Sequence, residues 1–150
     1  MTFVATAPVK PEKELPHHPF WPAIQPGVFR EAMNVDGAVT PERLLHALTE
    51  AVVHVNSELK LWRTAQQAAG HETLNAVPDE EPGRLAFLYR RAVYESAAAD
   101  LMERYIRFDA TGAAGVRAEQ QEPAIEDHWR NAFWALRDLL GQPRSTVELI

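Results

Sequence analysis

Apolar side chains recur every three or four residues along three long stretches of the chain, the spacing of amphipathic α-helices. The first helix is predicted between Thr40-Pro41-Glu42 and Gly70. A threonine N-cap, a proline at the first helical position and an early carboxylate favour a helix start, and a glycine in the left-handed conformation commonly ends one. Its apolar positions are Leu44, Leu48, Ala51 or Val52, Val55, Leu59 and Trp62.

A second helix is predicted from about Pro82 to Phe108, and its apolar face shifts midway. The first half presents Leu85, Leu88, Tyr89, Ala92 and Val93, and the second half presents Leu101, Met102, Tyr105 and Phe108 in a different direction. Such a helix can bury its halves against different neighbours. An irregular core in one domain and contact with a second chain explain the shift equally well.

The last helix is predicted from about Pro123 to Gly141-Gln142-Pro143, where glycine and proline end it. Its apolar face consists of Ile125, Trp129, Ala132, Phe133, Leu136, Leu139 and Leu140. The preceding residues 109–122, small, polar and glycine-containing, are expected to form a mobile loop. Pro26 starts a short helix that runs to about Met33.

The two ends of the chain differ from this helical middle. Residues 1–25 contain five prolines, which favour an extended arm. Within it Phe20, Trp21 and Ile24 pack either on their own domain, the slightly favoured interpretation, or on a partner. The expected organisation is an arm over 1–25, a helical domain over 26–142 and an extended tail over 143–150. The fold class is all-α: an antiparallel helical bundle of three main helices and one short helix, with extended arms at both ends.

Charge and composition narrow the function. The chain has 21 acidic and 15 basic residues, so its net charge of −6 argues against a general nucleic-acid binder. It has no cysteine, which excludes disulfides, thiol nucleophiles and cysteine-based zinc sites. No apolar run reaches membrane-spanning length, and the first residues lack the apolar region of a secretory signal, so we expect folding in a cytoplasm.

Catalytic chemistry is not evident. No serine lies in a Gly-x-Ser-x-Gly setting and no phosphate-binding glycine loop occurs. His46, Glu50 and His54 share one helix face, but the two histidines are more than two turns apart, too far to share one ion without further ligands. We therefore expect no catalytic residue, no metal and no cofactor. Two alternatives stay open: a helical metalloenzyme using this trio, and a small helical regulatory or antitoxin-like binding module.

Several segments, in order, resemble the head completion/stabilisation protein family (GPL) of contractile-tailed bacteriophages. They are the Trp21-Pro22-x-Ile24 entry, the Val39-Thr40-x-x-Arg-Leu helix start, "AGHETLNAVP", "YRRAVY", "ERYIRFDA", "WRNAFWA" and the closing "GQPR". The resemblance extends from Phe20 to Ile150 and departs before Phe20 and over residues 109–122.

The resemblance implies a structural virion protein and not an enzyme. Such proteins act as head-tail adaptors in the neck of the virion. They assemble in the host cytoplasm as a homo-oligomeric ring of about twelve copies beneath the portal protein. The ring would retain the packaged DNA and offer a docking surface to the tail terminator or another neck protein. Double-stranded DNA would pass through the channel without sequence-specific binding, which a negative net charge permits.

Two sets of site residues follow as hypotheses. For portal binding, the tail would add as a strand to a sheet edge on the portal or on a neighbouring subunit, with Val147 and Leu149 or Ile150 in pockets. Arg144 would bind a carboxylate of the partner. The full portal-binding set is Arg144, Ser145, Thr146, Val147, Glu148, Leu149 and Ile150. The alternative is a tail folded back on its own bundle. The expected inter-subunit set is Phe20, Trp21, Leu101, Met102, Tyr105 and Phe108.

Overall fold

The computed structural model describes residues 15, 17–108 and 114–144, with the backbone alone for 105–108 and 114–122. Over these residues the fold is all-α, as expected from the sequence, with five α-helices and no strand. The helices are α1 (Pro26–Met33), α2 (Pro41–Glu58), α3 (Lys60–Ala68), α4 (Arg84–Phe108) and α5 (Ala114–Leu139), and a 3₁₀ turn, η1, spans Leu74–Ala76. No helix of this described part is long and apolar enough to cross a membrane.

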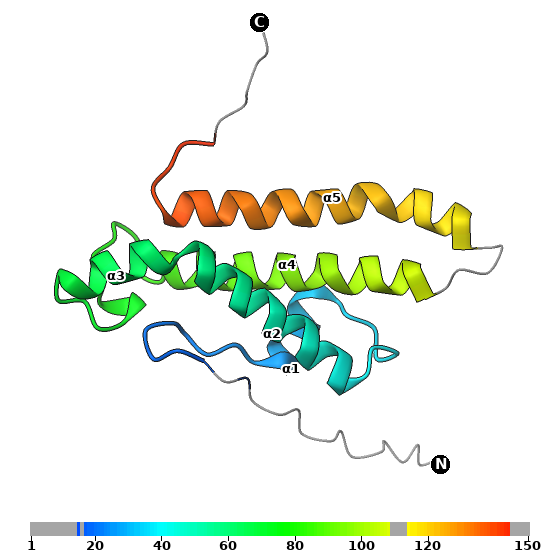
Figure 1. The fold of residues 1–150 in the computed structure, drawn as a ribbon, viewed down its shortest axis with the longest axis horizontal. Helices are drawn as coiled ribbons and strands as arrows, with labels where there is room; N and C mark the ends of the chain where they lie inside the picture. The colour runs from blue at the N-terminus through cyan, green and yellow to red at the C-terminus, as the bar shows by residue number, and fades with distance from the viewer. Residues whose placement is uncertain (1–14, 16, 109–113, 145–150) are drawn as a thin grey trace, which may run out of the picture.

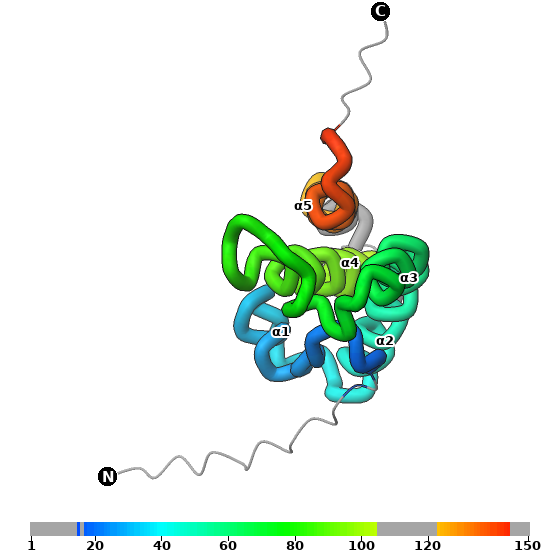
Figure 2. Tube along the Cα trace, turned by 90° about the vertical axis from the view of Figure 1, so that its left-hand side faces the viewer, coloured from blue at the N-terminus to red at the C-terminus, as the bar shows by residue number. Residues whose placement is uncertain are grey.

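Helix α4 is the centre of the bundle (Figures 1 and 2). Helix α5 runs antiparallel along one side of α4 and makes its main contacts with α4 alone. Helices α1 and α2 and the turn η1 pack against the other sides of α4. The first half of α4 is therefore enclosed from several directions, which is why alanines and large apolar side chains are buried around most of its circumference.

Local signals located two helix ends correctly. The Thr40 hydroxyl accepts a hydrogen bond from the Arg43 amide, and Pro41 is the first residue of α2. Gly70 ends α3 with a φ of +96°, and the His71 amide donates to the carbonyl of Gln66. This is the Schellman arrangement that a glycine after a helix favours, because glycine has no Cβ to oppose a left-handed backbone.

The prediction of one continuous helix between residues 40 and 70 was wrong. The chain breaks at Leu59, whose φ of −94° and ψ of 2° separate α2 from α3. Leu59 is fully buried in the core, whereas no residue of α3 is buried. The apolar spacing continues in phase from Leu59 to Trp62, so periodicity gave no sign of the break.

The start of the last helix was also predicted wrongly. Helix α5 begins at Ala114, so residues 114–122 are helical and not loop, while residues 109–113 lie outside the described residues. Pro123 is inside the helix and not at its first position. Alanine, arginine, glutamate and glutamine dominate 114–122 and favour helix, and proline removes only one internal hydrogen bond.

The described part of the proline-rich segment packs on its own chain, as the favoured interpretation expected. Phe20, Trp21 and Ile24 are at most 3% exposed. The carbonyl of Phe20 accepts a hydrogen bond from the amide of Leu74 at 2.8 Å. Two segments far apart in sequence are thus joined, and the core includes residues that precede α1.

Candidate functional site

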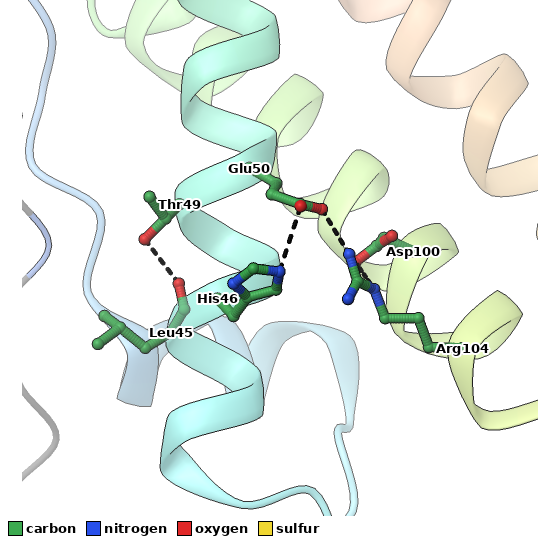
Figure 3. Close-up of polar contacts among 6 residues, drawn as sticks. All are labelled: Leu45, His46, Thr49, Glu50, Asp100 and Arg104. Atoms are coloured by element: carbon green, nitrogen blue, oxygen red, sulfur yellow. Dashed lines mark hydrogen bonds and ion pairs between the residues drawn. The ribbon is translucent and has the colours of Figure 1, made fainter. Parts of the chain in front are cut away.

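The His46–Glu50 pair belongs to a polar chain that links α2 to α4 (Figure 3). His46 Nε2 lies 3.2 Å from one carboxylate oxygen of Glu50, and Arg104 of α4 lies 2.7 Å from the other. Arg104 also donates to Asp100 at 2.9 Å, and this hydrogen bond is the main reason that its pKa is raised. The guanidinium of Arg104, a permanent cation, therefore lies between the carboxylates of Glu50 and Asp100 and joins α4 to α2.

Metal binding finds no support in the part of the chain that the structure describes. It contains no group of three or more histidine, aspartate or glutamate side chains placed to hold an ion. The trio on α2 therefore does not form the metal site that a helical metalloenzyme would need.

A DNA-binding module would need a basic patch, and the one that the sequence offers on α4, Arg84, Arg90 and Arg91, is partly neutralised. Arg84 pairs with Asp79 at 3.2 Å and donates to the main-chain carbonyl of Asp138. Arg91 lies 4.0 Å from Glu95. Guanidiniums that are already paired have less to offer to phosphates, so the patch is a poor electrostatic footprint for nucleic acid.

Polar side chains also connect α4 with α5. Glu95, on α4, lies 2.5 Å from His128 Nδ1 and 3.5 Å from the Asn131 amide nitrogen, both on α5. The indole N–H of Trp129 donates to Glu103 at 2.8 Å. Small residues at helical spacing from these contacts are buried: Ala92 and Ala99 are three residues before and four after Glu95 on α4, and Ala132 and Ala135 are four and seven residues after His128 on α5. Small side chains allow two helices to approach closely, and the polar contacts then set their register.

Residues 141–143, where the C-terminal tail begins, are bonded to the end of α5. Gly141 has a φ of +69°, and the amide of Gln142 donates to the carbonyl of Arg137. Arg137 in turn donates to the carbonyl of Pro143 at 3.0 Å. The chain therefore stops its helix at the predicted glycine and turns back toward the last turn of α5.

Arg144 completes this anchor. Its guanidinium donates to both carboxylate oxygens of Asp138, at 3.2 and 2.6 Å. It also lies over the ring of Trp134, 4.8 Å from the ring centroid, and Arg130 lies 5.0 Å from the same centroid. The carboxylate that Arg144 contacts thus belongs to its own chain. Paired bonds to a carboxylate together with stacking on an indole hold Arg144 against the last turns of α5.

The structure describes the two predicted sets of site residues to different extents. Phe20 and Trp21 are 1% and 2% exposed and contact their own chain. Leu101 and Met102 are half-buried, and Leu101 packs against the core. Tyr105 and Phe108 lie in the last turn of α4, where the backbone alone is described. Within the portal-binding set, Ser145 to Ile150 lie outside the described residues.

Sequence reasoning missed two groups of residues. Phe87 is 61% exposed on α4, and Phe133, counted with the buried face of α5, is 52% exposed. Trp134 and Asp138 were not recognised as the partners of Arg144. The sequence did offer one signal for this pair. Trp134 and Asp138 are four residues apart, so they are neighbours on one face of a helix.

Two comparisons place the chain among known proteins. A family model described as phage head completion protein (GPL) matches residues 15–150. The head completion/stabilization protein of Escherichia phage P2 is 34% identical over 152 residues, covering 99% of this chain and 90% of that protein. No solved structure matches.

Proposed function

Because the chain belongs to the phage head completion protein (GPL) family, we propose that it forms a ring beneath the portal of the filled head. The family is one of structural phage proteins and not of enzymes, and its role is head completion. The finer proposal is that about twelve copies close the portal vertex, retain the DNA and present a surface for the tail. The protein would act in the neck of the virion after assembly in the host cytoplasm.

The observation that carries this proposal is that the first residues of the tail, Pro143 and Arg144, are bonded to the end of α5. Arg144 is held by Asp138 and Trp134, while Arg137 binds the carbonyl of Pro143. A peptide whose first residue is fixed loses less conformational entropy when it binds than a free one does. We therefore assign Ser145 to Ile150 as the segment that adds to a sheet edge of the portal, with Arg144 as its anchor on the subunit.

Charge supports the channel role. The chain has a net charge of −6, and the arginines near the start of α4 are partly paired with carboxylates. A ring channel lined by such side chains would bind few DNA phosphates, because tight DNA binding depends on unpaired cations that displace counterions. Double-stranded DNA could then move through the ring without sequence-specific contacts.

The test is native mass spectrometry of the purified chain with the portal protein from the same genome. We expect wild-type protein to form a layer on the portal, and deletion of Thr146 to Ile150 to abolish that layer while helix content by circular dichroism stays unchanged. Val147→Ser with Leu149→Ser should weaken attachment strongly. The matched control, Thr146→Ser with Glu148→Gln, should attach like wild type.

Two results would contradict the proposal. A stable dimer that ignores the portal would favour a small helical binding module instead. A tail deletion that loses helicity would mean that the tail is a structural part of the bundle and not a free binding segment.

A further inference from the structure

Helix α5 carries an aromatic surface that its own chain leaves open. Phe133 is 52% exposed and Trp129 is 38% exposed. On the neighbouring helix α4, Phe87 is 61% exposed. Burying a phenylalanine or tryptophan side chain is favourable relative to leaving it in water, so these exposed aromatic residues mark surfaces that are suited to cover by a partner.

Trp129 and Phe133 lie on the side of α4 where α2 packs. Trp129 precedes Phe133 by one helical turn and donates its indole N–H to Glu103 of α4. Glu103 follows Tyr89 by fourteen residues, nearly four full turns, so both lie on the same side of α4. The hydroxyl of Tyr89 donates to Asn56 of α2 at 2.8 Å. We call the surface of Glu126, Trp129 and Phe133 the α2-side flank.

Phe87 lies on the opposite side of α4. Tyr94 follows it by seven residues, nearly two turns, and therefore shares its side. The ring of Tyr94 meets that of Phe29 in α1, with centroids 5.4 Å apart. Figure 2, which looks along α4, places α1 and α2 on opposite sides beneath α5. We call the surface of Phe87, Arg90 and Arg91 the α1-side flank.

We propose that the α2-side flank of one copy of this chain docks on the α1-side flank of the next copy. This inference rests on the proposed ring and names the surfaces that form it. A single copy cannot bring its two flanks together, because α4 and α5 lie between them. A two-fold dimer would pair one flank with itself and leave the other in water. A head-to-tail contact uses both flanks in every copy, and it closes into a ring when the rotation between neighbours permits.

The charges beside the aromatic residues are complementary. Glu126 lies on the α2-side flank, seven residues before Phe133, and is exposed. Arg90 and Arg91 follow Phe87 by three and four residues and remain partly exposed. Pairing a flank with itself would bring like charges together, whereas pairing the two different flanks brings a carboxylate toward guanidiniums. Two cations lie beside these residues on α5: Arg130 pairs with Asp127 at 2.7 Å, and Arg137 is held over Phe133 and bonded to the carbonyl of Pro143.

The absence of cysteine from the sequence permits a direct test by cross-linking. Phe133→Cys and Phe87→Cys are made singly and together in the full chain, bound to the portal and also free at high concentration, and oxidised with diamide. Val53→Cys is the matched control, because Val53 is 64% exposed on α2 and belongs to neither flank. Products are separated on a non-reducing gel and weighed.

The expected result is a disulfide-linked pair only when the two single variants are mixed, and a ladder of linked chains from the double variant. Linked dimers of either single variant alone would overturn the proposal in favour of a two-fold contact. Cross-linking no faster than that of Val53→Cys would overturn it as well. A wild-type chain that forms no layer on the portal contradicts the proposed function instead, and the free-chain reactions still decide the contact.

Discussion

The ring of Trp21 lies parallel to the ring of Tyr89, with 4.6 Å between the centroids and 4° between the planes. Trp62 also stacks on Trp21, with 6.3 Å between the centroids, and Phe20 meets Trp21 edge-on at 4.8 Å. A segment rich in proline, the first turn of α3 and the central helix therefore meet in one aromatic cluster. Stacked and edge-on aromatic pairs stabilise beyond the area that they bury.

Trp21→Ala tests the contribution of this cluster. We expect a loss of about 3–5 kcal/mol in the free energy of unfolding, because a large ring leaves a cavity that its neighbours fill only in part. Urea unfolding followed by circular dichroism measures it. Trp129→Ala is the control, since Trp129 is partly exposed and its removal should cost clearly less. A loss below about 1 kcal/mol for Trp21→Ala would show that the segment does not belong to the core.

Tyr89→Phe tests the buried phenol at high pH. Burial raises the pKa of Tyr89 well above its ordinary value of 10.0. The unfolded chain therefore releases this proton first, and its contribution to stability, complete below pH 10, is lost as pH rises further. The slope is about 1.4 kcal/mol for each pH unit.

The variant should be less stable than wild type at pH 7 by about 1 kcal/mol, the net value of one hydrogen bond. Between pH 10 and 11.5 its unfolding free energy should fall less steeply than that of wild type. Denaturant titrations at several pH values measure both effects. Parallel stability curves for the two proteins would contradict an abnormal phenol at this position.

Arg144→Ala tests the anchor of the tail. The pKa of Asp138 is held below its ordinary value of 3.8, chiefly by the hydrogen bond from Arg144. Because the folded-state pKa is lowered, the stabilisation is present above pH 3.8 and is lost as pH falls through the folded value. In the variant we expect the pKa of Asp138 to rise, measured by NMR titration of its carboxyl carbon. Arg130→Ala, which removes the other guanidinium beside Trp134, should leave that pKa in place.

Pro123→Ala tests the extended start of α5. Proline in a helix interior leaves the carbonyl four residues earlier without its donor, so alanine restores one hydrogen bond and should raise stability by up to about 3 kcal/mol. Thermal unfolding measures the change. Pro143→Ala, beyond the end of the helix, is the control and should have little effect. If residues 114–122 were a loop, Pro123→Ala would not raise the stability, and the result would match that of the control.

Several features could be predicted from the sequence because they depend on a few neighbouring residues. The Thr40 cap with Pro41, the stops at Gly70 and Gly141, and helix α1 from Pro26 to Met33 are set by local backbone preferences and side-chain bonds. The family could be recognised for a similar reason. Short sequence segments in a fixed order identify it, and recognising them requires no knowledge of which residues are in contact.

The tertiary structure decided what depends on distant parts of the chain. Leu59 breaks a helix although the apolar period continues through it, and Trp21 belongs to the core because Tyr89 and Trp62 lie beside it. Phe133 shares the apolar spacing of α5 yet stays half exposed, because within the described residues α5 packs mainly on one helix, α4. Periodicity reports which side chains are apolar and how they are spaced around a helix, but only the packed neighbours determine which of them are covered.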